Sequence, residues 1–166
     1  MEESVVERVK NLFKMPQSLC RQCGQCCRVV CFKGGLSYEE LIETIKKENT
    51  SDADKVLIEG IKDFLTLFRP YKSNEEAREK NPSFVEKFRA RVKNYDENKQ
   101  YFYCCKFLDD DNRCLIHEDR PTLCRLYPLP HERTIFYDNC GYEQTAKSNI
   151  KEIADIIERL KKGEIL

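Results

Sequence analysis

The chain has 166 residues, and its 29 basic and 29 acidic residues give a formal net charge of zero. This balance argues against a general nucleic-acid binder, which depends on a strongly basic surface, so nucleic acid is not an expected partner, although a local basic patch stays open. The length fits a single domain over residues 1–166, and a mean hydropathy of −0.66 with no tryptophan predicts a modest apolar core.

Apolar residues recur at helical spacing along most of the chain, and polar or proline breaks separate the segments. Ser4 with Glu7, and Ser37 with Glu40, have the spacing of a capping box, and each pair introduces an apolar stripe. Gly163 follows the last stripe, where a glycine commonly ends a helix. The predicted helices cover residues 4–14, a segment that begins at Ser37, and residues 52–68, 73–80, 82–95 and 148–162.

Short β-prone runs appear only after residue 99. Tyr101–Tyr103 and residues 115–116 flank the turn-forming residues 109–112, a pattern that predicts a small hairpin. Residues 134–137 are a further predicted strand, and Pro121 is expected to begin a short helical turn.

The expected fold class is therefore mostly α with a small irregular β element. Two cysteine-bearing irregular regions interrupt the helices. The predicted order is a first cysteine block at residues 20–31, a helical insert at 37–95, a second cysteine block at 104–140 and a C-terminal helix at 148–162.

Ten cysteines are far above ordinary usage for a chain of this size. They form disulfides in an oxidising compartment, whereas in the cytosol they bind metal or carry out redox chemistry. The first residues, MEESVVERVKNLFK, are charged throughout and lack the apolar segment of a secretory signal, and no apolar run approaches membrane-spanning length. We therefore expect a cytoplasmic protein with no membrane partner, whose reduced cysteines bind a metal ion.

The first block reads Cys20-x2-Cys23-x2-Cys26-Cys27. A gap of two residues lets successive thiolates converge on one metal. Three cysteines at this spacing with a remote fourth are typical of bacterial [4Fe–4S] ferredoxins, although no cysteine here precedes a proline as it does in that pattern. The same Cys-x2-Cys unit also forms half of a zinc ribbon site. Zinc and iron thus both remain open, and the ferredoxin-like spacing favours an iron–sulfur cluster.

Cys26 and Cys27 are adjacent in the sequence. Neighbouring side chains diverge in most backbone conformations, so we expect the two thiols to serve different metals or to bridge them. This interpretation favours a centre that holds more than one metal.

The second block adds Cys105-x-Phe-Leu, Cys114-x-Ile, Arg120-Pro-x2-Cys124-Arg125-x-Tyr-Pro and finally Cys140. Together with the first block, this run resembles the CxxCxxCC cysteine-cluster family, also called YkgJ-like, a zinc- or iron-chelating domain. The resemblance spans residues 20–140. It implies a metal-stabilised domain with eight ligands: Cys20, Cys23, Cys26, Cys27, Cys105, Cys114, Cys124 and Cys140.

The same resemblance leaves Cys31 and Cys104 outside the ligand set, and His117 stands where the family often has tyrosine. Two zinc ions held by eight thiolates would carry a net charge of about −4. Arg120 and Arg125, which flank Cys124, are therefore expected to donate hydrogen bonds to the ligand sulfurs.

No catalytic residues are predicted, because the chain has no P-loop, no GxGxxG and no GxSxG motif. Two alternatives to simple metal binding remain. A flagellin lysine N-methylase shares the cysteine pattern, so a metal-dependent modifying enzyme is one, and a cavity lined by Cys31, His117 or Arg125 would favour it. A thiol redox sensor is the other, with Cys31 or Cys104 as the reactive group. No protein partner is indicated.

Overall fold

The computed structural model describes residues 4–32, 35–47, 51–99, 101–131 and 134–164. About 52% of the chain is helical and 7% is strand, the latter in a three-stranded antiparallel sheet, which confirms the predicted class. The chain divides into two compact units, each described here by itself. The central unit comprises residues 22–119, and the terminal unit comprises residues 1–21 and 120–166. The expectation of a single domain over 1–166 stays a prediction.

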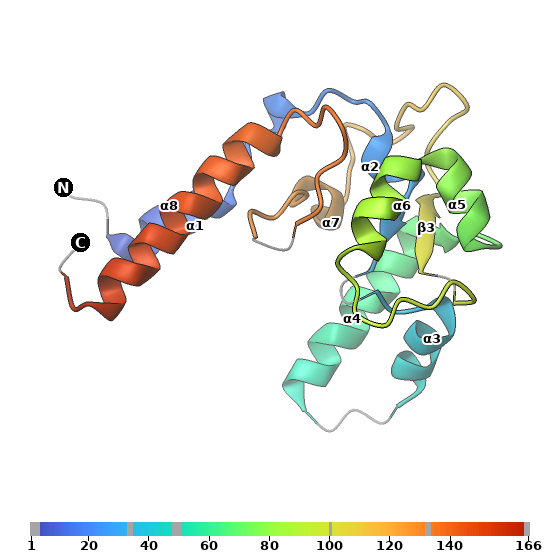
Figure 1. Cartoon of the computed structure of the whole chain (residues 1–166), viewed down its shortest axis with the longest axis horizontal. Helices are drawn as coiled ribbons and strands as arrows, with labels where there is room; N and C mark the ends of the chain where they lie inside the picture. Colours follow the sequence, from blue (N-terminus) through green and yellow to red (C-terminus); the bar gives the residue numbers. More distant parts are fainter. Residues whose placement is uncertain (1–3, 33–34, 48–50, 100, 132–133, 165–166) are drawn as a thin grey trace. The chain divides into compact units, whose positions relative to one another are not determined.

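The sheet of the central unit contains β1 (Val30–Cys31), β2 (Phe68–Pro70) and β3 (Phe102–Cys105) in the order β1-β3-β2. Both pairings are antiparallel, with Val30 opposite Tyr103 and Phe68 opposite Cys105. Phe102 and Tyr103 are fully buried, as expected for a central strand. This sheet brings the chain just after Cys27 beside the strand that ends at Cys105 (Figure 1).

The predicted hairpin between residues 101–103 and 115–116 is wrong in its pairing. The partners of β3 are β1 and β2, because the buried β3 has both edges satisfied by those strands. Leu115 is 67% exposed and lies outside the sheet. The expected turn does form, however, and an isolated bridge between Leu108 and Cys114 closes it.

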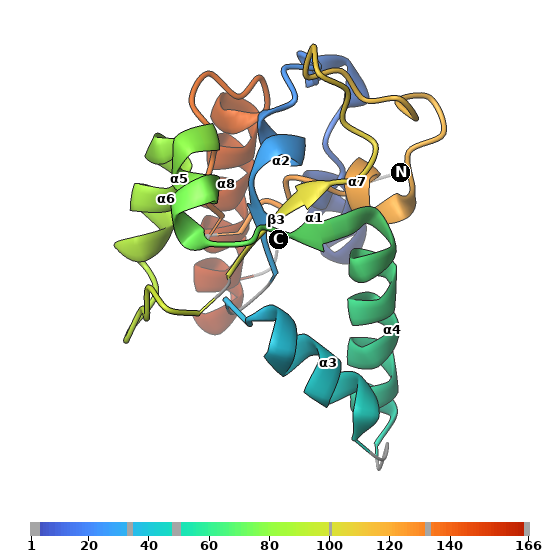
Figure 2. The same cartoon turned by 90° about the vertical axis from the view of Figure 1, so that its right-hand side faces the viewer.

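The helices of the central unit surround this sheet, and their apolar stripes supply most of its core. Leu41, Ile61 and Val85 are fully buried, and Phe64 stacks edge-on to Tyr103. In Figure 2, α5 and α6 lie to one side of β3 and α4 to the other. The helices are α2 (Gln25–Arg28), α3 (Tyr38–Lys46), α4 (Asp52–Leu67), α5 (Asn74–Lys80) and α6 (Pro82–Arg89).

Two predicted elements end differently in the structure. The helix predicted over 82–95 stops at Arg89, because Asn94 adopts a left-handed conformation and Tyr95 turns back onto the ring of Tyr101. The strand predicted over 134–137 is irregular chain. Among the described residues of the terminal unit there is no strand to pair with it, and Phe136 and Tyr137 are buried there against other side chains.

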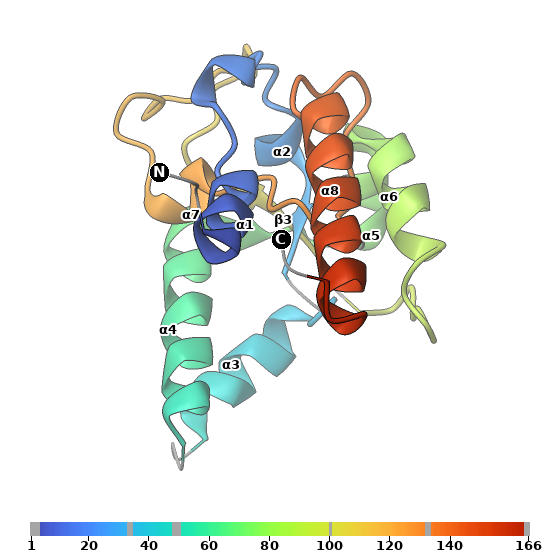
Figure 3. The same ribbon diagram turned by 90° about the vertical axis from the view of Figure 1, so that its left-hand side faces the viewer.

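The terminal unit is built on α1 (Val5–Phe13) and α8 (Glu143–Lys161), which lie side by side in Figure 3. Asn149 donates to the carbonyl of Leu12 over 2.8 Å. A one-turn 3-10 helix (Gln17–Leu19) and α7 (Thr122–Arg125) complete the unit. Its core is a cluster of Met15, Phe136, Tyr142 and Ala146, against which Leu19, Cys20, Cys140 and Ile150 pack.

The predicted C-terminal helix begins five residues earlier than expected, at Glu143 rather than 148. The helix begins earlier because Tyr142 and Ala146, which precede the predicted start, are already buried in the core of the terminal unit. None of the helices in the described ranges has the length and apolarity that a bilayer-spanning segment requires.

Candidate metal centre

The ten cysteines all lie within described residues, and no disulfide joins any of them. The central unit contains seven of them and the terminal unit contains Cys20, Cys124 and Cys140. The two predicted cysteine blocks therefore both contribute to each unit, which is the kind of convergence that metal ligation requires.

Four half-buried thiols gather in the central unit, and we call them the central thiol group: Cys26, Cys27, Cys105 and Cys114. The thiol of Cys105 donates to Cys27, and that of Cys27 donates to Cys26. Cys114 is close enough to Cys27 to interact electrostatically. Cysteines from both blocks thus meet around Cys27.

The contact between Cys26 and Cys27 corrects the expectation that these neighbours diverge. Both residues lie on the helical turn α2, where consecutive side chains are about 100° apart and two sulfurs can approach each other. Two cysteines that are adjacent in the sequence can therefore lie at the same site.

The surroundings of Cys27 and Cys105 favour the neutral thiols. The hydrogen bond from Cys105 lowers the pKa of Cys27, but the hydrogen bond to Cys26, burial and the neighbouring thiols together raise the pKa well above its usual range. The pKa of Cys105 is also well above its usual range, because its hydrogen bond to Cys27 and burial both disfavour the thiolate. A metal that binds here must displace protons.

We call the three cysteines of the terminal unit the terminal thiol group: Cys20, Cys124 and Cys140. Cys20 and Cys140 pack against the same apolar cluster. The Nη1 of Arg120 lies 3.8 Å from the sulfur of Cys20, and the hydroxyl of Tyr142 also hydrogen-bonds with Cys20, while burial raises the pKa of Tyr142 to about 12. Arg120 thus lies within reach of a cysteine sulfur, and its predicted role beside a bound metal stays a prediction.

Gln17 connects α7, which carries Cys124, to the segment of Cys20. Its side chain donates to the carbonyl of Arg125 over 2.9 Å and accepts from Arg120 over 3.2 Å. The Nε of Arg125 donates to the carbonyl of Arg120 over 2.6 Å. Arg125 thus fixes the backbone of Arg120, and its predicted hydrogen bond to a sulfur stays a prediction.

The donor set fits a thiophilic metal, since clustered thiolates select zinc, copper(I) or iron–sulfur clusters. Among the described residues, however, no three His, Cys, Asp or Glu side chains already have the arrangement that would hold one ion. Metal–sulfur bonds are about 2.3 Å long, so the sulfurs of a group would have to turn toward one ion when their protons are displaced.

The other predicted candidates lie outside these groups. Cys23 is exposed, and its role as a ligand stays a prediction. Cys31 is partly buried on β1, and burial raises its pKa to about 12. Burial also raises the pKa of Cys104, whose side chain hydrogen-bonds with Tyr71. The Nδ1 of His117 lies 3.0 Å from a carboxylate oxygen of Glu118.

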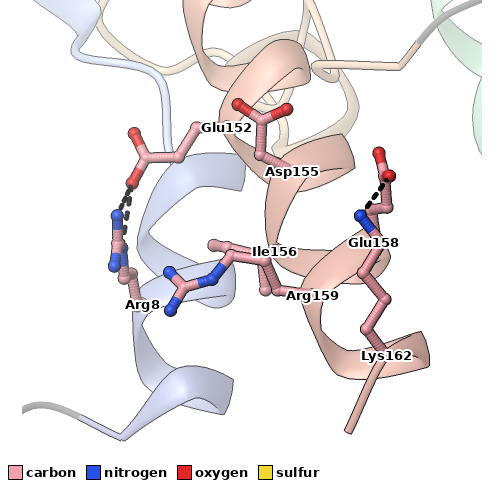
Figure 4. A pocket seen from close by; sticks show the side chains of 7 residues that line it. All are labelled: Arg8, Glu152, Asp155, Ile156, Glu158, Arg159 and Lys162. Atoms are coloured by element: carbon pink, nitrogen blue, oxygen red, sulfur yellow. Dashed lines mark hydrogen bonds and ion pairs between the residues drawn. The ribbon is translucent and has the colours of Figure 1, made fainter. Parts of the chain in front are cut away.

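Two open hollows mark the surface of the terminal unit. One lies between α1 and α8 and is lined mainly by charged side chains, several of them paired, as in Arg8 with Glu152 and Lys162 with Glu158 (Figure 4). The other borders Cys140 and is lined also by Arg21, Gly141, Glu143, Gln144 and Lys147. Neither is lined by Cys31, His117 or Arg125, the residues whose cavity would have favoured an enzyme.

Sequence reasoning missed several residues that position the thiols. Gly24 and Gly141 each follow a cysteine directly, and each lies against the backbone of a distant segment. The sequence shows that each glycine follows a cysteine, but it does not show which distant backbone segment lies against that glycine. Asn112, predicted only as a turn residue, accepts a hydrogen bond from Arg28 over 3.1 Å.

Comparison with known proteins finds one family. A family model with the pattern CxxCxxCC, described as a "putative zinc- or iron-chelating domain", matches residues 19–153. The match covers most of the chain and spans all the cysteines of both thiol groups. No curated protein and no solved structure matches the chain.

Proposed function

The chain belongs to the CxxCxxCC family of zinc- or iron-chelating domains, and we propose that it holds its metal through the cysteines that the fold gathers from distant parts of the sequence. The observation that carries this proposal is the hydrogen-bonded run from Cys105 through Cys27 to Cys26. Thiols 78 positions apart (105 minus 27) meet in a half-buried group, and metal ligation explains this better than core packing does.

The proposed ligands are the eight cysteines implied by the family pattern. Seven of them belong to the central and terminal thiol groups, and Cys23 is the eighth. Arg120 supports the ligand role of Cys20 because a cation that donates to sulfur stabilises the thiolate against protonation.

The identity of the metal rests on two opposing arguments. The spacing of the first block favours an iron–sulfur cluster bound by Cys20, Cys23 and Cys26 together. Four thiols gathered in one group suit a tetrahedral zinc site equally well.

Purification without oxygen, followed by elemental analysis and a visible spectrum, tests the proposal. Stoichiometric zinc in a colourless protein, or iron with sulfide and charge-transfer bands, would support it and identify the metal. Cys27→Ser should lose bound metal, whereas Cys31→Ser should retain it, because Cys31 lies outside both groups. Purified protein that contains neither metal, and takes up neither after reduction, would contradict it.

No observation favours the two alternatives. A redox sensor needs an exposed thiol with a low pKa, and the pKa values of Cys31 and Cys104 are both raised. The methylase-like enzyme needs a cavity at the metal, and the hollow that borders the proposed ligand Cys140 is not lined by Cys31, His117 or Arg125. We propose the cytoplasm as the location, since reduced thiols persist there.

A further inference from the structure

Separate contacts hold together the chain segments that carry each thiol group. From this we infer that the chain builds two metal centres. One would form from the central thiol group and the other from the terminal thiol group, each within its own compact unit. The inference rests on the proposed function, because it divides the proposed cysteine ligands between two sites.

In the central unit, the turn that precedes Cys114 is held against the segment of Cys26 and Cys27 at two points. Gly24 has a φ of +68°, and a Cβ there would lie 2.4 Å from the carbonyl oxygen of Asn112. Beyond the cysteine pair, the Nε of Arg28 donates to Oδ1 of Asn112 over 3.1 Å. The two contacts flank the pair Cys26 and Cys27, and both fix Asn112, which lies two residues before Cys114, against that segment. Only glycine permits the first of them.

In the terminal unit, the neighbours of Cys20 contact the neighbours of Cys140. A Cβ on Gly141 would lie 2.1 Å from the carbonyl oxygen of Leu19. On the other side of each cysteine, Nη1 of Arg21 donates to the carbonyl of Asn139 over 3.2 Å. The two segments therefore run antiparallel, and Cys20 and Cys140 stand opposite each other.

The contacts of the central unit share no residue with those of the terminal unit, and each contact lies wholly within one unit. Because metal binding is coupled to the local folding that brings its ligands together, the loss of one contact should empty one centre and spare the other. A single centre fed by all the cysteines would instead respond as a whole to either loss.

The test compares Gly24→Ala and Gly141→Ala with Gly60→Ala in the full-length, metal-loaded protein. Gly60 is the matched control, because a Cβ there meets nothing within 4 Å and the residue lies inside α4. Each of the first two variants should retain about half of the parent's metal, and Gly60→Ala should retain all of it. Mass spectrometry after alkylation locates the loss. Gly24→Ala should expose the central thiol group alone, and Gly141→Ala the terminal group alone.

Arg28→Ala and Arg21→Ala remove one side-chain contact each without a backbone clash, so they serve if an alanine at a glycine position unfolds the chain. They should accelerate metal loss to a chelator from the central and terminal groups respectively. The two-centre inference would be overturned if either arginine variant exposed the cysteines of both groups to alkylation. It would also be overturned if both glycine variants stayed folded and lost all of their metal. A parent protein that binds no metal would overturn the proposed function as well.

Discussion

Cys27 shows how neighbouring groups determine the charge state of a ligand thiol. Its hydrogen bond to Cys26, its burial and the nearby thiols raise its pKa, in spite of the hydrogen bond from Cys105. The thiol is therefore neutral around neutral pH in the absence of metal. The cysteines themselves were visible in the sequence, but the proton network was not, because it depends on which sulfurs meet.

The raised pKa values predict the direction of a pH effect on metal binding. A thiol with a raised pKa keeps its proton below that pKa, and the metal must displace it. Affinity for zinc should therefore fall as pH falls, about tenfold per pH unit for each proton displaced. Competition with a chromophoric chelator between about pH 6.5 and 7.5 measures this. An affinity that does not change with pH would show that Cys27 and Cys105 are not ligands.

Cys31, in contrast to the proposed ligands, should not respond to metal binding. Burial raises its pKa to about 12, so it should resist iodoacetamide at pH 8 in the folded protein and react only after denaturation. Metal removal should leave this protection in place. Rapid alkylation of Cys31 in the native protein, read by mass spectrometry, would restore the redox-sensor alternative.

At the scale of elements, β3 determines where Cys105 lies. The helices could be predicted because their apolar stripes and caps are long local signals, as with Ser37 and Glu40, which form the expected capping box. The partners of β3 could not, since β1 and β2 contain two and three residues and show no alternation. Their pairing is determined by burial on both faces of Phe102 and Tyr103.

Removing a buried side chain from β3 should therefore weaken metal binding as well as the fold. Phe102 is fully buried, and Phe102→Ala should destabilise the central unit by about 3–5 kcal/mol. Because Phe102 lies on the strand that ends at Cys105, zinc loss to a chelator should also accelerate. Leu115→Ala is the control, since Leu115 is exposed and its removal should change stability by less than about 0.5 kcal/mol. Equal denaturation midpoints for the two variants would contradict this assignment.

At the scale of the whole molecule, the division into two units could not be read from the sequence. The boundary falls between Arg21 and Gln22, inside the first cysteine block, and no linker composition marks it. The terminal unit also joins the two ends of the chain through contacts such as that between Leu12 and Asn149. Each unit is small, so a metal is expected to contribute substantially to its stability.

X-ray absorption at the metal edge of the purified protein tests the central claim most directly, because it reports the atoms bound to the metal. Ligation by the clustered cysteines predicts a first shell dominated by sulfur at about 2.3 Å, and partial loss of that shell in Cys27→Ser. A first shell of oxygen and nitrogen, or one unchanged in Cys27→Ser, would contradict it.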